Sequence, residues 1–134
     1  HPVAWIHATA LRTEPLAYSG RDQVNPQAGR DAAAALWKAA GITNPIEEID
    51  VAEIYAPFSH QQLILTEALG LTPSTRVNPS GGALAANPMF STGLERIGFA
   101  ARHIFDGSAR RVLAHATSGP VLQQNLVAVM EGDA

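Results

Sequence analysis

The 134-residue sequence contains no cysteine. A chain without cysteine has no disulfide framework, no thiolate nucleophile and no cysteine-based zinc site. This absence is in line with a reducing compartment, and we expect a cytoplasmic protein. Any chemistry that the chain performs must come from other side chains.

Basic residues are also few, because nine Lys and Arg stand against twelve Asp and Glu, for a net charge of −3. The pair Arg110 and Arg111 and the lone Arg12 form no basic run, so we expect no nucleic-acid partner. No apolar run approaches the roughly 20 residues of a transmembrane helix. We therefore expect no membrane span.

The apolar content of 46% with 16% charged residues is typical of a globular chain with a sizeable core. At this length we expect one domain, residues 1–134. The sequence begins at His1 rather than at Met, and we expect this end to be a cut end.

Apolar patterns and turn residues predict an alternation of strands and helices. The predicted strands are 3–11, 46–55, 76–78, 110–116 and 122–131, and the predicted helices are 25–40, 59–69 and 90–106. This order predicts an α/β fold with a mixed sheet of about five strands covered by helices. Ligands of such folds bind at the carboxyl ends of strands, which here are Tyr55, Asn78 and Ala116.

The most informative segment is the glycine-rich stretch 77–82, with Asn78, Gly81 and Gly82. A glycine pair lets the backbone approach a ligand closely. We expect the stretch to lead into the helix near 90, whose free N–H groups favour a carbonyl oxygen with negative charge. The alternative is a strand, a tight turn and a helix with no site.

Four blocks, residues 50–59, 63–71, 78–93 and 112–131, together resemble the C-terminal half of a thiolase-superfamily enzyme. They are similar, in order, to the strand and loop of the family's Asn-Glu-Ala-Phe motif, the helix after it, the Asn-x-x-Gly-Gly to Gly-His-Pro to Thr-Gly segment, and the last two strands with their Cys-x-Gly turn. The sterol-carrier-protein or lipid-transfer-protein branch, related to acetyl-CoA acetyltransferases, is the most similar. The resemblance spans most of the chain from about residue 25, and 78–93 is its most specific part.

The resemblance implies one half of an α-β-α-β-α layered enzyme of lipid or steroid metabolism. The other, N-terminal half carries the family's nucleophilic cysteine and would be a partner of this chain. The resemblance further implies an acyl-CoA thioester as substrate with no separate cofactor, a homo-oligomer when complete, and in some relatives an OB-fold accessory protein. Without its mate, such a half exposes an apolar face.

Two departures from the family exclude its usual chemistry. Asn87 stands where the family has the His of Gly-His-Pro. Its amide can donate a hydrogen bond to an oxyanion but cannot transfer a proton, and the alternative is that it caps a turn before Pro88. The second catalytic cysteine falls at Ala116, or at Val121 in another alignment, and both are inert. We therefore expect no cysteine-dependent Claisen condensation or thiolysis.

A third departure suggests another reaction. Tyr55 replaces the Asn of Asn-Glu-Ala-Phe, and its phenol, with an ordinary pKa of about 10, can exchange a proton if tuned. Some lipid-transfer-protein relatives resemble this change and are aldolases that cleave a β-hydroxyacyl-CoA during steroid breakdown. The alternative is a strand-end tyrosine with its ring in the core.

His115 is the third catalytic candidate, with a hydrogen-bonded core histidine as its alternative. His60 lies near Tyr55, but the histidines have no adjacent carboxylate cluster, and we expect no metal site. We expect His103 to interact with its helix C-terminus. Glu53 and Glu67 are expected to be solvated carboxylates.

The resemblance implies that five residues bind substrate: Phe58, Asn78, Gly81, Gly82 and Ser118. The leading hypothesis is half of an acyl-CoA carbon–carbon lyase or acyltransferase, inactive alone, in which Tyr55, Asn87 and His115 are catalytic. The alternative is an inactive thiolase-like subunit or scaffold that binds acyl-CoA or a partner protein. A third reading is a fragment with no activity of its own.

Overall fold

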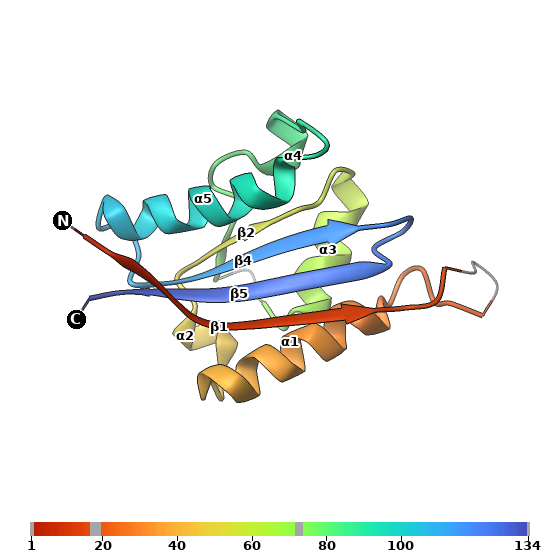
Figure 1. Cartoon of the computed structure of the whole chain (residues 1–134), viewed down its shortest axis with the longest axis horizontal. Coiled ribbons are helices and arrows are strands. Elements are labelled where there is room, and N and C mark those ends of the chain that lie inside the picture. The colour runs from red at the N-terminus through yellow and green to blue at the C-terminus, as the bar shows by residue number, and fades with distance from the viewer. Residues whose placement is uncertain (1, 17–19, 72–73, 134) are drawn as a thin grey trace.

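The computed structural model describes residues 2–16, 20–71 and 74–133. In these residues five strands form a single sheet, with five helices around it (Figure 1). The strands are β1 (Ala4–Thr13), β2 (Val51–Ile54), β3 (Arg76–Val77), β4 (Arg111–Ser118) and β5 (Gln124–Gly132). The helices are α1 (Gln27–Ala40), α2 (Pro45–Glu48), α3 (Ser59–Ala68), α4 (Gly82–Ala85) and α5 (Thr92–Phe105).

The sheet is mixed and its strand order is β1-β5-β4-β2-β3. Strand β2 pairs in parallel with both β3 and β4, whereas β5 is antiparallel to β4 and to β1. The α/β class and the five-stranded mixed sheet expected from the sequence are thus confirmed. No helix in the described part of the chain is long and apolar enough to cross a membrane.

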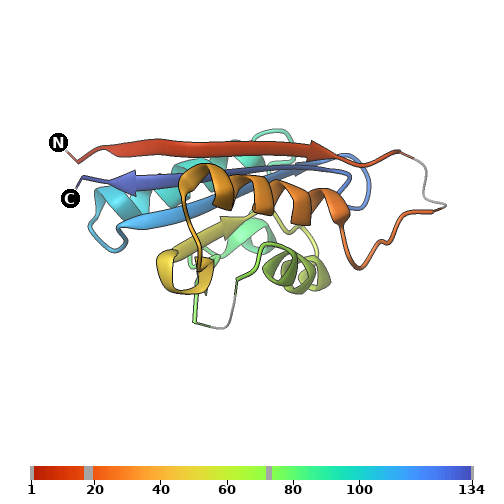
Figure 2. The same ribbon diagram turned by 90° about the horizontal axis from the view of Figure 1, so that it is seen from below.

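Helices cover both faces of the sheet, with α1 and α3 on one face and α5 on the other (Figures 1 and 2). The first face holds the larger core, in which Ala32, Ala33 and Leu36 of α1 pack with Leu65 of α3. Small alanine side chains let α1 lie close to the sheet. Helix α1 ends at Gly41, whose left-handed backbone conformation caps the helix.

On the opposite face, α5 lies over β2 and β4 and covers β1 only near its start, where Ala4 packs against this second core (Figure 1). Ala100 and Ile104 of α5 pack on the sheet here. Ile6 pairs with Met130, which belongs to this second core, and directly paired residues share one face of a sheet. Ile6 is nevertheless 63% exposed, so this face is only partly covered within the described chain.

Two predictions about the secondary structure were wrong. The strand expected at 46–55 is a short helix, α2, followed by β2 at Val51–Ile54. Pro45 occupies the first helical position, and the Glu48 carboxylate accepts the N–H groups of Thr43 and Asn44. The glycine pair also does not lead directly into the long helix, because the one-turn helix α4 and a loop lie between them.

Strand and helix ends shifted for local reasons. The predicted caps Asn25 and Ser59 are displaced, because Pro26 and Phe58 occupy the N-cap positions. Strand β5 begins at Gln124 rather than at 122, because Val121 and Leu122 have positive φ values of 52° and 56° and form the turn from β4.

Candidate functional site

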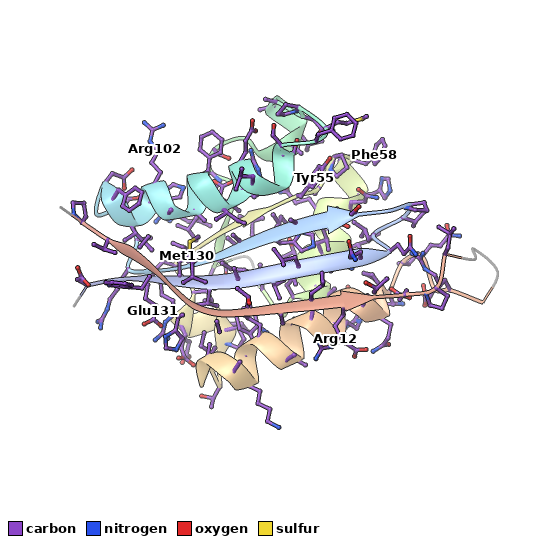
Figure 3. All side chains as sticks on the ribbon, viewed as in Figure 1. Arg12, Tyr55, Phe58, Arg102, Met130 and Glu131 are labelled. Atoms are coloured by element: carbon purple, nitrogen blue, oxygen red, sulfur yellow. The ribbon has the colours of Figure 1, made fainter. Side chains whose placement is uncertain are left out.

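A hollow of about 370 Å³ lies at the end of the sheet where β2 and β4 finish. Its lining consists of Tyr55, Pro57, Phe58, Gln61, Met89, Phe90 and residues 117–122. Figure 3 labels Tyr55 and Phe58 at this end of the molecule. Because the carboxyl ends of parallel strands are where α/β folds bind ligands, we take this hollow as the candidate site.

The hydroxyl of Tyr55 reaches the side chain of Asn87. Tyr55 Oη donates to Asn87 Oδ1 at 3.1 Å, and Thr92 Oγ1 donates to the same oxygen at 2.8 Å. Thr92 is fully buried in the first turn of α5, so it fixes the orientation of the Asn87 amide. Two donors on Oδ1 leave both amide hydrogens of Asn87 available to another acceptor.

The first turn of α5 lies directly against β4. A Cβ added to Gly93 would lie 2.8 Å from the Cβ of Ala116. Ala116 is not at the end of its strand, as the sequence had suggested, but two residues before it. This close approach determines how far Thr92 lies from the sheet.

His115 is fully buried in β4 and both of its ring nitrogens have partners. Asn125 donates to the carbonyl of Leu122, so its Oδ1 faces the histidine and accepts from Nε2 at 2.9 Å. The ring therefore carries its proton on Nε2, and Nδ1 accepts the backbone N–H of Tyr55 at 3.3 Å, an N–H that also donates to the backbone carbonyl of His115 at 3.2 Å. Burial lowers the pKa of His115 to about 4, against the weaker effect of the Asn125 hydrogen bond.

The glycine-rich stretch lies beside the hollow rather than in its lining. Of the five predicted substrate-binding residues, Phe58 and Ser118 line the hollow, whereas Asn78, Gly81 and Gly82 do not. Asn78 has a positive φ of 51°, and its side chain accepts the N–H of Ile54 at 2.7 Å. A Cβ on Gly82 would lie 2.8 Å from Asn78 Nδ2. These residues thus join the loop to β2.

Asn78→Ala should lower the free energy of unfolding by about 2–3 kcal/mol. The substitution leaves the buried N–H of Ile54 without a partner and places an alanine at positive φ. Urea unfolding measures the loss. Asn78→Gly should lose less, because glycine adopts this conformation freely. The exposed control Asn25→Ala should change stability by no more than about 0.5 kcal/mol; an equal effect of all three would contradict this role of Asn78.

Glu53 and Arg96 form a buried ion pair that the sequence analysis missed. Glu53 was expected to be solvated, but it is 0% exposed, and Arg96 Nη1 donates to its Oε2 at 3.1 Å. Ser80 donates to both carboxylate oxygens through its N–H and its hydroxyl, at 3.1 and 2.6 Å. The pair therefore ties α5 and the glycine-rich stretch to β2.

The histidines outside the sheet also have partners. His103 Nε2 lies 3.5 Å from Glu53 Oε1, and its Nδ1 lies 3.0 Å from Ser108 Oγ. It therefore contacts the buried carboxylate rather than only its helix end. His60 is the second residue of α3, and its ring stacks on Phe58 with centroids 5.9 Å apart.

The turn that borders the hollow carries backbone strain. Positive φ at a β-branched residue such as Val121 is rare and unfavourable, and Leu122 next to it is also positive. Arg21 holds the turn by donating to the carbonyls of Pro120 and Val121. Strain of this kind persists where the surroundings enforce it, often at functional sites.

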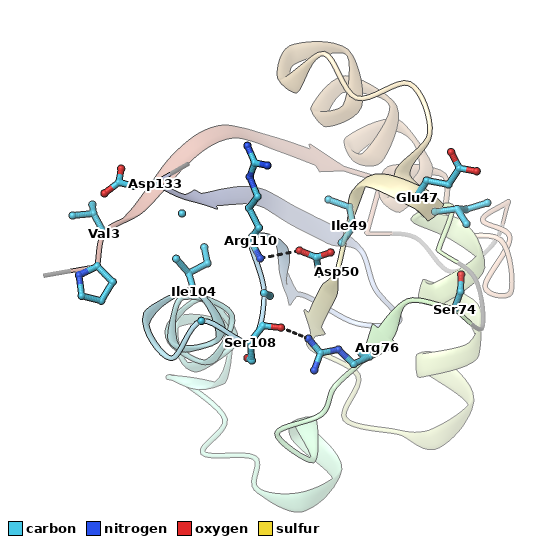
Figure 4. Close-up of a pocket in the computed structure, with 15 residues that line it drawn as sticks. Val3, Glu47, Ile49, Asp50, Ser74, Arg76, Ile104, Ser108, Arg110 and Asp133 are labelled. Atoms are coloured by element: carbon cyan, nitrogen blue, oxygen red, sulfur yellow. Dashed lines mark hydrogen bonds between the residues drawn. The ribbon is translucent and has the colours of Figure 1, made fainter.

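A larger hollow of about 760 Å³ lies at the other end of the sheet, where β2 and β4 begin (Figure 4). Asp50 there accepts the N–H of Arg110 at 2.8 Å, and Arg76 donates to the carbonyl of Ser108 at 2.6 Å. None of the predicted site residues lines this hollow. The candidate site is therefore the smaller of these two hollows, and it is identified by its position and its lining residues rather than by its volume.

Within residues 2–16, 20–71 and 74–133, no group of three or more His, Asp or Glu side chains could hold a metal ion. The chain matches no model of a known protein family, and no curated protein sequence matches it significantly.

Proposed function

We propose that the chain is the C-terminal, thioester-binding half of a thiolase-like enzyme that cleaves β-hydroxyacyl-CoA by a retro-aldol reaction. The observation that carries the proposal is the contact of Tyr55, which lines the hollow, with Asn87, whose amide is also held by Thr92. This contact brings the phenol of Tyr55 next to the Asn87 amide, whose two N–H hydrogens are available to donate to a thioester oxygen. The cytoplasm is the proposed location.

The reaction needs a base and a hydrogen-bond donor but no nucleophile. Tyr55 acts as the general base that takes the proton of the β-hydroxyl. The bond between the α and β carbons then breaks, and the β carbon becomes a carbonyl carbon. The electron pair of the broken bond forms the enolate of a shorter acyl-CoA. The Asn87 amide stabilises the enolate oxygen, and the proton that Tyr55 took from the hydroxyl is delivered to the α carbon, which restores Tyr55 and completes the exchange.

In this proposal His115 positions Tyr55 rather than transferring a proton. Both of its nitrogens are engaged, and its lowered pKa keeps the ring neutral near pH 7. The N–H of Tyr55 is shared between His115 Nδ1 and the backbone carbonyl of His115, so this residue fixes the end of β2 from which the phenol reaches Asn87.

The proposed partner is the N-terminal thiolase-like half, which would cover the mouth of the hollow. Three apolar side chains are exposed there, Phe58 at 60%, Met89 at 66% and Phe90 at 100%. Asn87 is exposed as well. A hydrogen bond to an enolate is worth more when water is excluded, and a second polypeptide would supply that exclusion. An OB-fold protein and a homo-oligomer remain further proposed partners.

The second candidate function is an inactive subunit or scaffold that binds acyl-CoA or a partner protein. Ala116 supports it, because no proton-transfer group stands at that place in β4. The neutral, fully engaged His115 supports it too.

Tyr55→Phe distinguishes the two functions. In the complete enzyme, formed by this chain and its N-terminal half, it should lower turnover of a β-hydroxyacyl-CoA by about 10²-fold or more, because general-base catalysis is lost. Release of the shorter acyl-CoA, followed by liquid chromatography, measures the rate. Unchanged turnover in Tyr55→Phe would remove Tyr55 from the mechanism, and no turnover in the unaltered enzyme would favour the scaffold.

A further inference from the structure

Strand β1 forms one edge of the sheet, and its outer side pairs with no other strand of the described residues (Figure 1). It is ten residues long, whereas β3 at the opposite edge has only two. Proteins usually protect such an edge by keeping it short or by placing proline or lysine in it. Strand β1 contains neither, and His7 and Arg12 are its only ionisable side chains. Its outer N–H and C=O groups are therefore available to a further strand.

The large apolar side chains of β1 are exposed. Trp5 is 60% exposed, Ile6 63% and Leu11 49%. Their pairing with β5 places Ile6 and Leu11 on one face of the sheet and Trp5 on the other. The strand thus offers apolar contacts on both of its faces as well as hydrogen bonds along its edge.

A β-bulge near the start of β1 determines which residues can face each other when two copies of this strand pair. The register with β5 shifts between Ile6 and Ala8, so His7 is an extra residue. When Thr9 lies on the two-fold axis of two antiparallel copies, the bulge brings Ile6 of one copy opposite Leu11 of the other. Both side chains lie on the same face of the sheet. The strand is therefore complementary to itself in this register.

The same register gives Arg12 partners that it lacks in the single chain. Arg12 comes to lie opposite Trp5 of the second copy, whose indole donates to Asp133 at 2.8 Å. In the single chain Arg12 donates to the carbonyl of its neighbour Leu11 at 2.7 Å, and neither Arg12 nor Asp133 forms an ion pair within the described residues. A guanidinium is attracted both by an indole face and by a carboxylate.

We propose that two copies of this chain associate through their β1 edges, antiparallel about Thr9, so that their two sheets become one continuous sheet. Such a pair has two-fold symmetry, and each contact occurs twice. No residue of β1 lines the candidate hollow, which stays open in both copies. The inference does not depend on the proposed function.

Sedimentation equilibrium of the chain tests the surface. A dimer should predominate at about 1 mM chain. Ile6→Lys should weaken the association at least about tenfold, because a charge replaces an apolar side chain at two symmetric places. Leu63→Lys is the matched control, since Leu63 lies on α3 and is 74% exposed, and it should leave the association unchanged. Circular dichroism checks that both variants are folded.

A single introduced cysteine tests the register, because the chain has no cysteine of its own. Thr9→Cys places two thiols opposite each other, with Cα atoms about 4.5–5.5 Å apart, a separation that a disulfide bridges. Thr13→Cys is the control on the same strand and is equally exposed, but its two copies would lie roughly 25 Å apart. Oxidised glutathione should therefore convert Thr9→Cys, and not Thr13→Cys, into a covalent dimer.

Each contrary result overturns a stated part of the proposal. A chain that stays monomeric at about 1 mM would refute the association and leave the edge to a different polypeptide. Equal weakening by Ile6→Lys and Leu63→Lys would show that β1 is not the contact. Equal cross-linking of Thr9→Cys and Thr13→Cys would refute the register. The proposed function is tested separately, by turnover in the complete enzyme.

Discussion

Glu53→Ala is expected to lower the free energy of unfolding by about 3–5 kcal/mol, because the buried guanidinium of Arg96 loses its buried counter-charge and keeps only the partly exposed Glu95, 3.8 Å from its Nη2. Arg96 is 1% exposed, so water cannot replace the lost carboxylate. Ser80 would lose its acceptor as well. Since proteins of this size are stable by about 5–15 kcal/mol, the variant should be close to unfolding at room temperature, as urea denaturation followed by circular dichroism would show.

Two further variants test the cause. Glu67→Ala removes a carboxylate of the same type whose side chain is 76% exposed, and its effect should stay within about 1 kcal/mol. The double variant Glu53→Met with Arg96→Met removes both charges, and it should recover much of the loss, because no unpaired charge remains in the interior. A double variant as unstable as Glu53→Ala would show that the hydrogen bonds of the loop, rather than the ion pair, are what matters.

Stability should fall by about 3 kcal/mol as the pH drops from about 6.5 to about 4, through His115 alone. Burial lowers the pKa of His115 in the folded chain to about 4, whereas the unfolded chain keeps the ordinary value near 6.5. Between these values only the unfolded chain binds the proton, so protonation favours unfolding. The full contribution is present above about pH 6.5, and below about pH 4 the folded state is protonated too and the loss ends.

His115→Gln isolates this effect from the carboxylates that titrate in the same range. The glutamine amide can donate to Asn125 and accept from the backbone of Tyr55, as the neutral imidazole does, but it does not titrate. The difference in unfolding free energy between the two proteins should therefore change with pH at up to about 1.4 kcal/mol per unit. Parallel pH profiles would show that His115 is not held neutral.

The α/β class and the sheet were predictable because long elements have strong periodic signals. The alanine-rich helix that ends at Gly41 and the strand that ends near Tyr55 were both found. Residues 46–49 were misread, because a helix of four residues has no period to detect and its caps come from side chains such as Glu48. The start of β5 was misplaced at Leu122, because no local preference favours the positive φ that Val121 and Leu122 adopt.

The candidate site was predictable only in part. The proximity of Tyr55 and Asn87 follows from where a strand end and a loop meet, and the resemblance had placed both in one site. The pairing of Glu53 with Arg96 joins residues 43 positions apart, which no spacing rule detects. A glutamate inside the apolar run 51–54 was the available signal, since charges are rarely buried without a partner.

The close packing of Gly93 on Ala116 controls where the Asn87 amide lies, although neither residue contacts that amide in a hydrogen bond. Thr92 positions Asn87, and its neighbour Gly93 rests on β4 with no room for a methyl group. The distance between the Tyr55 hydroxyl and the Asn87 amide therefore depends on how closely Gly93 packs on Ala116 of β4. An added methyl group at position 93 would therefore move the amide of Asn87 relative to Tyr55 without replacing either residue.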